Sequence, residues 1–178
     1  MDFNPKQKWS LESFYKRMCE LQSAQDCIPE QVILAFSRLK HLSKSKVVFD
    51  SEHGINGNYY IGSVEIWNTS EFSPWQIAKP ITMVLGNLTY IDDRDDNQNL
   101  ALLEILNGAK VFVSGDLNVS NLFISEGQLY CLGKVEVTDT LSISEKSFLA
   151  AEEITCQKYE AFGRVQCDRI HFKAKISY

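Results

Sequence analysis

Apolar residues occur in pairs separated by one residue, and the pairs recur about every six positions from Val111 to the C-terminus. Residues i and i+2 of a strand point to the same side, so each pair predicts a very short strand with one buried face. The pairs are Val111 and Val113, Leu117 and Val119, Leu122 and Ile124, Leu129 and Cys131, Val135 and Val137, Leu141 and Ile143, Phe148 and Ala150, Ile154 and Cys156, Val165 and Cys167, and Ile170 and Phe172. Short strands at such regular spacing predict a β-solenoid, whose coils stack into a long surface.

The coil length follows from superposing the pairs. Val111 and Leu129 are 18 residues apart, whereas Leu129 and Phe148 are 19 apart, which places one inserted residue near positions 138–140. Three short strands per coil then give a roughly triangular cross-section. One inner column is predicted to hold Leu117, Val135 and Ile154. A single coil cannot bury its own apolar face, so the coils must stack.

The first 45 residues have a different period. Apolar residues recur at helical spacing after Ser10, a suitable N-cap, and again after Pro29, which suits a first helical turn. From Lys46 the period becomes alternating, and residues 100–106 are predicted to form a short helix inserted between coils. We therefore predict an α-helical extension or cap over residues 1–45 and a mainly β solenoid over residues 46–178, with regular coils from about residue 108.

The segments Gly115–Val119 and Gly133–Val137 repeat the same pattern of glycine, polar and apolar residues. Over about the last 70 residues, this periodicity resembles right-handed parallel β-helices of the bactofilin, polymer-forming type. The resemblance implies a parallel β-helix and, as a function, self-assembly into a structural polymer. The first 110 residues do not fit that family. Left-handed hexapeptide acyltransferases are the other solenoid to consider, but their repeat carries one aliphatic residue per six instead of two.

Composition and charge limit the classes of function. The chain has 178 residues, 44% of them hydrophobic, which suits an ordinary globular protein with a sizeable core. Its net charge of −5 disfavours nucleic-acid binding, because neutralising phosphates needs clustered Lys and Arg. Negative charge is compatible with a basic protein partner.

The cysteines and the N-terminus predict a cytoplasmic protein. Five cysteines are an odd number and include no Cys-x-x-Cys, and three of them occupy apolar positions of the strand pairs, so we expect free thiols in a reducing compartment. The N-terminus has no apolar stretch typical of a signal peptide, and the apolar runs are too short to cross a bilayer. No membrane partner is expected.

An acidic stretch holds Asp92, Asp93, Asp95 and Asp96. From Asp93 onward, oxygen-bearing side chains recur at the spacing of an EF-hand calcium loop, with Glu104 at the twelfth position. Gln98 stands where that loop needs glycine, and the preceding residues are predicted to form a strand instead of a helix. We therefore expect a solvated acidic loop and no metal site.

Candidate catalytic residues are scarce. The three histidines are His41, His53 and His171, and His171 should face outward because it lies between Ile170 and Phe172. Glu136 has only Asn118 and Thr155 beside it in its outer column, which does not provide the paired carboxylates of polysaccharide chemistry. The sequence has no phosphate-binding loop, zinc spacing or dinucleotide motif. We expect no enzyme, no catalytic residues and no cofactor.

The outward positions contain one apolar column. Phe112 and Tyr130 lie 18 residues apart between inward pairs, and Leu149 is predicted to occupy the same position one coil later. Such a column indicates either a partner-binding face or the seat of the N-terminal helices, which need an apolar surface to lie on. For Trp67 and Trp75, the sequence likewise leaves two roles open: packing in the core or anchoring an interface.

These features predict a non-enzymatic protein-binding β-solenoid. The most specific hypothesis is an immunity protein that neutralises a cognate bacterial toxin, with negative charge steering a basic toxin domain. The alternatives are a bactofilin-like self-assembling structural protein and an enzyme with a lateral solenoid active site. The candidate partner-binding residues are the Phe112, Tyr130 and Leu149 column, Trp67, Trp75 and the four acidic residues of 92–96. The protein is expected to be a monomer, or a dimer through its C-terminal edge.

Overall fold

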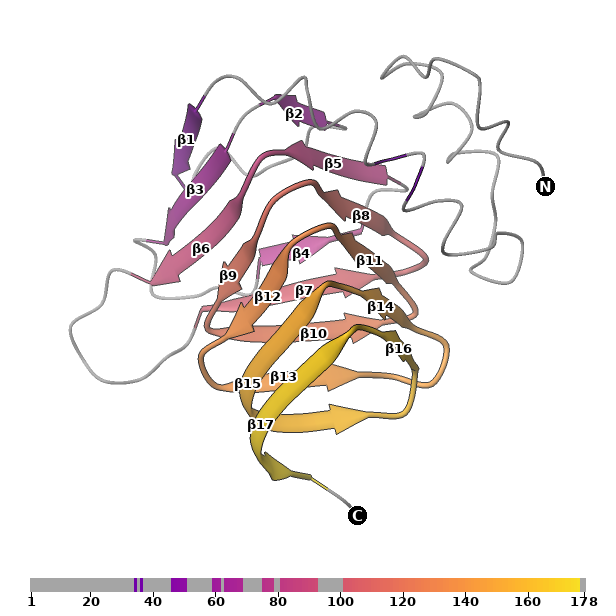
Figure 1. Ribbon diagram of the computed structural model, residues 1–178. Helices are drawn as coiled ribbons and strands as arrows, with labels where there is room; N and C mark the ends of the chain where they lie inside the picture. The colour runs from indigo at the N-terminus through magenta and orange to yellow at the C-terminus, as the bar shows by residue number, and fades with distance from the viewer. Residues whose placement is uncertain are drawn as a thin grey trace.

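A computed structural model shows that the chain forms a parallel β-solenoid, as the periodicity predicts (Figure 1). The structure describes residues 34, 36, 46–50, 59–61, 63–68, 75–78, 81–92 and 101–176. For residues 46–50, 59–61, 63–68, 91 and 92 the description is limited to the backbone. The N-terminal helical extension predicted for residues 1–45 lies outside the described residues, except for Leu34 and Phe36, which are both helical.

The described strands belong to two sheets. The eleven-stranded sheet contains β1 (Lys46–Asp50), β3 (Ser63–Asn68), β6 (Leu88–Asp92), β9 (Leu117–Val119), β12 (Lys134–Val137), β15 (Glu153–Ala161), β13 (Thr140–Ile143), β10 (Asn121–Ser125), β7 (Leu102–Leu106) and β4 (Trp75–Ile77) in that order, with β17 (Arg169–Lys175) paired to β15. The six-stranded sheet contains β16 (Arg164–Gln166), β14 (Phe148–Ala150), β11 (Gln128–Cys131), β8 (Lys110–Val113), β5 (Ile81–Leu85) and β2 (Tyr59–Ile61).

These sheets make three walls around the interior (Figure 1). The six-stranded sheet is the β8 wall. The eleven-stranded sheet bends at a corner and supplies two walls: the β9 wall, with β1, β3, β6, β9, β12 and the first halves of β15 and β17, and the β10 wall, with β4, β7, β10, β13, the second half of β15 and the end of β17. Because β15 runs through the corner, it pairs with β12 through its first residues and with β13 through its last.

The strand register measures the coil length. Val111 pairs with Leu129 and Leu122 pairs with Leu141, so the coil lengthens from 18 to 19 residues. The predicted insertion near residues 138–140 is therefore confirmed, because Val119 and Val137 before it still pair at 18. A second residue is inserted in the corner of residues 144–147, where Leu129 pairs with Leu149 and not with Phe148.

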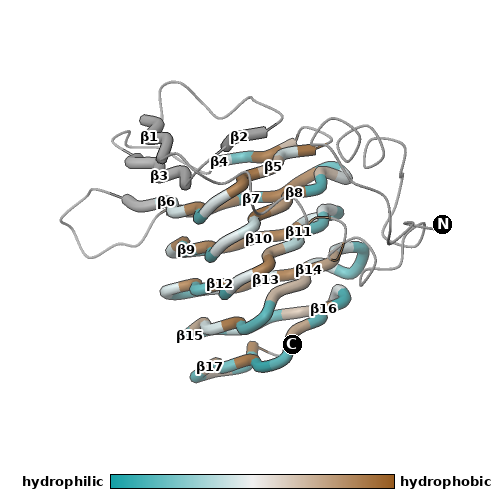
Figure 2. The backbone as a smooth tube through the Cα atoms, turned by 45° about the horizontal axis from the view of Figure 1, so that its top comes forward, coloured by the Kyte–Doolittle hydropathy of each residue, from teal (hydrophilic) through white to brown (hydrophobic). Residues whose placement is uncertain are grey.

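Stacked apolar columns form the core. Leu117, Val135 and Ile154 pair in register and are each fully buried, which confirms the predicted inner column. Figure 2 shows apolar segments that recur at matching places in successive coils. Parallel pairing puts the side chains of partner residues on the same face, so every added coil extends these columns and shields the one before it.

The corner between the β8 and β9 walls is built from stacked backbone. The Gly115 amide donates to the Gly86 carbonyl at 2.9 Å, and the Gly133 amide donates to the Gly115 carbonyl at 3.1 Å. Beside them, the Asp116 amide donates to Asn87 Oδ1 and the Lys134 amide donates to Asp116 Oδ1, both at 2.9 Å. These side-chain acceptors bind amides that leave the strand ladder at the turn.

Residues 102–106 contradict one prediction. They form strand β7 instead of part of an inserted helix, and Leu103 and Ile105 lie in the core between β4 and β10. Pairing on both sides outweighs the helical propensity of leucine and glutamate.

Within the described residues, no helix is long and apolar enough to cross a membrane.

Candidate binding surfaces

An aromatic column follows the outer face of the β8 wall. The rings of Phe112 and Tyr130 stack with centroids 4.9 Å apart and planes 8° from parallel, and the Phe148 ring is 5.2 Å from that of Tyr130. Leu149 does not belong to this column, because the second insertion shifts it to the inward side, in register with Leu129. The outer position opposite Tyr130 is held by Ala150.

This aromatic column is covered. Phe112 is 0% exposed and Tyr130 is 1% exposed, and the buried ring of Phe36 lies 5.2 Å from that of Phe112. Contact with Phe36 favours the alternative in which the N-terminal part of the chain lies on the column. Binding of a partner to this face stays a prediction, and it would require the covering residues to move.

Polar residues on the same outer face are also buried. Lys110 pairs with Ile81 on one side and with Gln128 on the other, and both polar side chains are only 5% exposed. The Tyr130 hydroxyl donates a hydrogen bond to Gln128 Oε1 at 3.0 Å. A buried polar group needs such a partner, so the Gln128–Tyr130 contact stabilises the column as part of the fold.

The two candidate tryptophans, Trp67 and Trp75, lie on different walls. Trp75 in β4 packs against the core, and its ring lies 5.7 Å from the Tyr90 ring in an edge-on arrangement. Trp67 in β3 pairs with Ile91, and the described part of this residue is its backbone. Core packing is therefore the observed role of Trp75.

The structure describes little of the acidic stretch. Asp92 ends β6 and pairs with Asn68, while Asp93, Asp95 and Asp96 lie outside the described residues. Glu104, the twelfth residue of the calcium-loop pattern, lies on β7 and accepts a hydrogen bond from Gln76 Nε2 at 2.7 Å. In the described part of the chain, no group of three or more His, Cys, Asp or Glu side chains could hold a metal ion.

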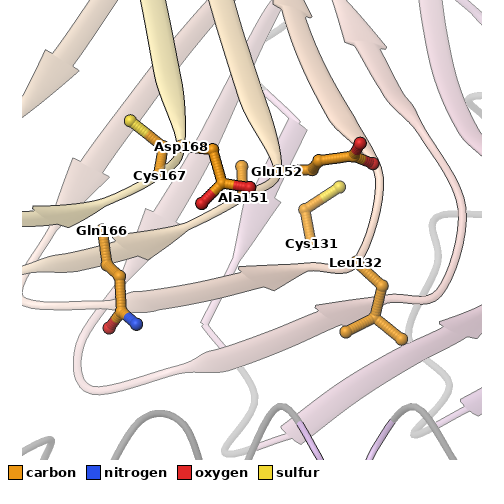
Figure 3. A pocket seen from close by; sticks show the side chains of 7 residues that line it. All are labelled: Cys131, Leu132, Ala151, Glu152, Gln166, Cys167 and Asp168. Carbon is orange, nitrogen blue, oxygen red and sulfur yellow. The ribbon is translucent and has the colours of Figure 1, made fainter.

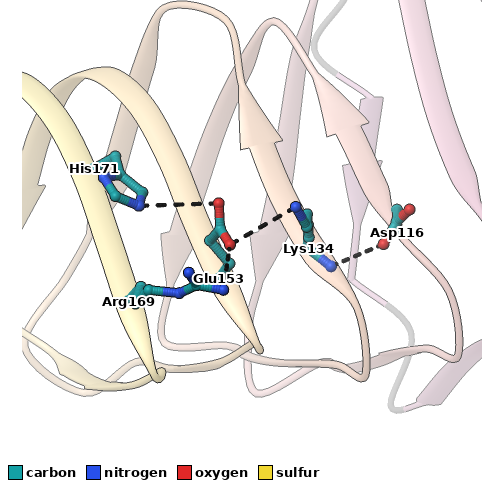
Figure 4. A network of polar contacts seen from close by, with 5 residues as sticks. All are labelled: Asp116, Lys134, Glu153, Arg169 and His171. Atoms are coloured by element: carbon teal, nitrogen blue, oxygen red, sulfur yellow. Dashed lines mark hydrogen bonds and ion pairs between the residues drawn. The ribbon is translucent and has the colours of Figure 1, made fainter.

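A polar network covers the end of the β9 wall (Figure 4). Glu153 is the centre of this network, with Arg169 Nη2 at 3.2 Å, Lys134 Nζ at 3.7 Å and His171 Nε2 at 3.9 Å from its carboxylate oxygens. His171 is exposed and points outward, as predicted. Two cations, Arg169 and Lys134, and the His171 ring surround one carboxylate, so this cluster links β12, β15 and β17.

The strand register gives Glu136 the neighbours that the sequence predicts for its outer column. Glu136 pairs with Asn118 on one side and Thr155 on the other, and Thr155 pairs in turn with His171. Glycosidase chemistry needs a second carboxylate on the facing side of the substrate. These neighbours of Glu136 do not supply it.

One pocket of about 270 Å³ opens at the corner between the β8 and β9 walls (Figure 3). It is lined by Cys131, Leu132, Ala151, Glu152, Gln166, Cys167 and Asp168. Burial, with a further contribution from the Asp168 carboxylate, raises the pKa of the Cys167 thiol. A raised pKa keeps the thiol protonated at neutral pH, so Cys167 is a poor nucleophile.

The described cysteines form no disulfide with one another. Cys131, Cys156 and Cys167 are all free thiols, whereas Cys19 and Cys27 lie outside the described residues. Burial raises the pKa of the Cys156 thiol to about 11. Cys131 and Cys156 are buried and fill apolar positions, whereas Cys167 is partly buried in the lining of the pocket.

The last coil, residues 162–176, is the most open apolar surface that the structure describes. Phe162 is 60% exposed and Phe172 is 43% exposed, and the inward residues Val165 and Ile170 are partly exposed. Among the described strands, β16 pairs only with β14 and β17 pairs only with β15. Within the described residues, β17 therefore has no strand paired on its outer side.

Sequence reasoning named the C-terminal edge as a dimer interface but did not include the residues of this coil among the candidate partner-binding residues. The pairs Val165 and Cys167, and Ile170 and Phe172, have the same spacing as the pairs of the buried coils, so the local pattern is unchanged at the end. The sequence feature that could have indicated this surface is Phe162, a large apolar residue at a corner where earlier coils carry small or polar residues.

Comparison of the chain with protein-family models, with curated proteins and with solved structures finds no match in any of the three.

Proposed function

We propose that this chain is a non-enzymatic protein-binding β-solenoid that docks its partner on the last coil. The observation that carries the proposal is the exposure of Phe162 and Phe172 in the coil whose strand β17 has no described strand on its outer side. Large exposed apolar side chains usually mark an interface when they cluster. A free strand edge offers unpaired amides and carbonyls to a second chain.

Apolar burial and backbone pairing act together at this end. A partner strand that pairs with β17 satisfies its backbone groups and covers the partly exposed inward residues, including Ile170. Each 100 Å² of apolar surface removed from water contributes about 2.5 kcal/mol before the costs of association. The last coil thus combines affinity from apolar contacts with orientation from hydrogen bonds.

Neutralisation of a bacterial toxin is the specific form of this proposal. A small chain with a net charge of −5 needs only a rigid complementary surface for that role. The last coil departs from the overall charge, since residues 162–176 carry four Lys and Arg against one Asp. The toxin segment that docks there is therefore expected to be acidic, while the remaining surface steers basic regions of the same partner.

Site-specific photo-cross-linking tests the docking surface. A photoreactive phenylalanine analogue is placed at Phe162 or Phe172 and, as a matched control, at Glu136, which is exposed on β12 in the middle of the solenoid. In cells of the natural source, both end positions should cross-link to the same protein, and position 136 should not. Equal labelling from all three positions, or none from the last coil, would contradict the proposal.

Co-expression tests the toxin hypothesis. The captured protein should arrest bacterial growth when it is expressed alone, and the wild-type chain should relieve the arrest. Phe172→Asp should lose this protection because it places a charge on the docking surface, whereas Glu136→Asp should keep it. A captured protein without toxicity would rule out neutralisation and leave protein binding in place.

A further inference from the structure

We propose that Lys175 prevents copies of this chain from stacking on the last coil and selects a partner strand with a carboxylate opposite it. This inference rests on the proposed function, since it concerns the same free edge. It names the chemistry of the partner segment: an extended strand, acidic at one position and apolar at another.

The register places Lys175 in an inner column. In the β10 wall, Leu122 pairs with Leu141, Leu141 pairs with Tyr159, and Tyr159 pairs with Lys175. The Ile176 amide donates to the Tyr159 carbonyl at 2.9 Å, which holds this alignment to the end of β17. Partner residues in parallel strands share a face, so Lys175 continues a column whose first members are buried apolar residues.

A charge at this position opposes further stacking. A second copy laid on the last coil would cover the Lys175 ammonium, and burying a charge that finds no counter-charge is strongly unfavourable. Inward-pointing charges at a free edge are a recognised way to block edge-to-edge aggregation. Among the described coils, this is the one that places a lysine in that column.

The neighbouring residues define what the partner must present. The Phe172 ring stacks on Tyr159 with centroids 5.4 Å apart and leaves part of its surface open. A strand paired with β17 therefore places one side chain over Phe172, where an apolar residue fits, and another over Lys175, where a carboxylate fits. Arg169 and Lys173 are exposed on the same strand and add positive charge.

Leucine substitutions test the block on stacking. Lys175→Leu removes the charge from the inner column, and Lys173→Leu makes the same chemical change at the corner of the same strand, outside that column; both lysines are exposed in the single chain. By light scattering after size exclusion, the wild type and Lys173→Leu should be monomers, and Lys175→Leu should be a dimer or larger. Circular dichroism checks that each variant is folded. A monomeric Lys175→Leu, or a wild type that already associates, would overturn the block.

Two peptides test the partner chemistry. Both copy the nine residues of β15 with Cys156→Val, and they carry either Tyr159→Glu or Tyr159→Leu. By fluorescence anisotropy, the wild type should bind the glutamate peptide about fivefold more tightly than the leucine peptide, the size of effect expected for one partly exposed ion pair. Lys175→Gln, which is neutral but polar and should stay monomeric, should lose this preference.

The outcomes separate the two proposals. Loss of the preference in Lys175→Gln, with Lys173→Gln unchanged, supports selection by Lys175. Equal binding of both peptides by the wild type would overturn that selection and leave strand docking intact. Failure of the wild type to bind either peptide would contradict docking on the edge of β17 itself, and with it the proposed function.

Discussion

The middle coils, residues 101–161, and the last coil follow the same sequence pattern but differ in what covers them. Leu117, Val135 and Ile154 are fully buried, whereas Ile170, the next residue of the same column, is partly exposed. In a solenoid, each coil contacts only its neighbours. The same apolar pair therefore forms core where coils lie on both sides and stays partly exposed where a described coil lies on one side only.

Aromatic residues repeat this contrast on other parts of the molecule. Tyr130 stacks between neighbouring rings and is 1% exposed, whereas Phe172 stacks on Tyr159 alone and is 43% exposed. Ring stacking is present in both places, so the number of covering layers decides whether an aromatic residue contributes to the fold or is available to a partner. Matched substitutions in the two regions can test this comparison.

The largest contrast is expected within one column. Val135→Asp buries a carboxylate among aliphatic side chains and should destabilise the fold by at least about 4 kcal/mol, enough to prevent folding of a marginally stable domain. Ile170→Asp in the same column should cost about 1 kcal/mol, because water reaches that position. Urea denaturation followed by circular dichroism measures both.

Equal losses at the two positions would break the comparison. They would mean that the last coil is as firmly part of the core as the middle coils, and its apolar residues could not be offered as a docking surface. Val135→Ala serves as a size control, because it removes apolar volume without adding charge and should cost about 2 kcal/mol.

The aromatic residues should show a smaller difference. Tyr130→Ala removes a buried ring from a stack and should cost about 3–5 kcal/mol, whereas Phe172→Ala should cost about 1 kcal/mol. Thermal melting measures both. If Tyr130→Ala left the melting temperature within a few degrees of the wild type, the column of Phe112, Tyr130 and Phe148 would be an open surface, and the partner-binding prediction for it would regain support.

Most of the coil architecture could be predicted from the sequence, because strand alternation has a period of two and the coils repeat it. The register failed at one strand. In β14, Phe148, Leu149 and Ala150 are all apolar, so alternation could not show which of them faces inward. The extra residue in the corner of residues 144–147 shifts the register, so that Leu149 faces inward. The residues of that corner are all polar, so the sequence does not show that the corner is one residue longer.

The candidate site was less predictable, because exposure depends on what covers a residue and not on its local pattern. Phe112 has the alternation of an outward residue, yet it is buried beside Phe36, which lies 76 positions away in the chain. Ile170 and Phe172 have the alternation of a core pair, yet both are open to solvent. Neither outcome can be read from neighbouring residues, since both depend on contacts between distant segments.

The smallest effect on stability is expected at the corner between the β8 and β9 walls, where the middle and last coils differ in backbone packing. A Cβ atom on Gly133 would lie 2.2 Å from Asp116 Oδ1 and 2.7 Å from the Gly115 carbonyl oxygen, so Gly133→Ala must push two coils apart. We expect a cost of about 1–3 kcal/mol, the usual penalty for overpacking.

Glu152 is the matched control for Gly133, because its amide donates to the Gly133 carbonyl at 3.0 Å and so it occupies the same corner one coil later. Glu152→Ala should change the stability by no more than about 0.5 kcal/mol, since its side chain is exposed and the corner already accommodates a Cβ atom there. Glu152 also lines the pocket that opens at this corner. If urea denaturation gave the same small change for both variants, tight backbone stacking would not distinguish the middle coils from the end of the solenoid.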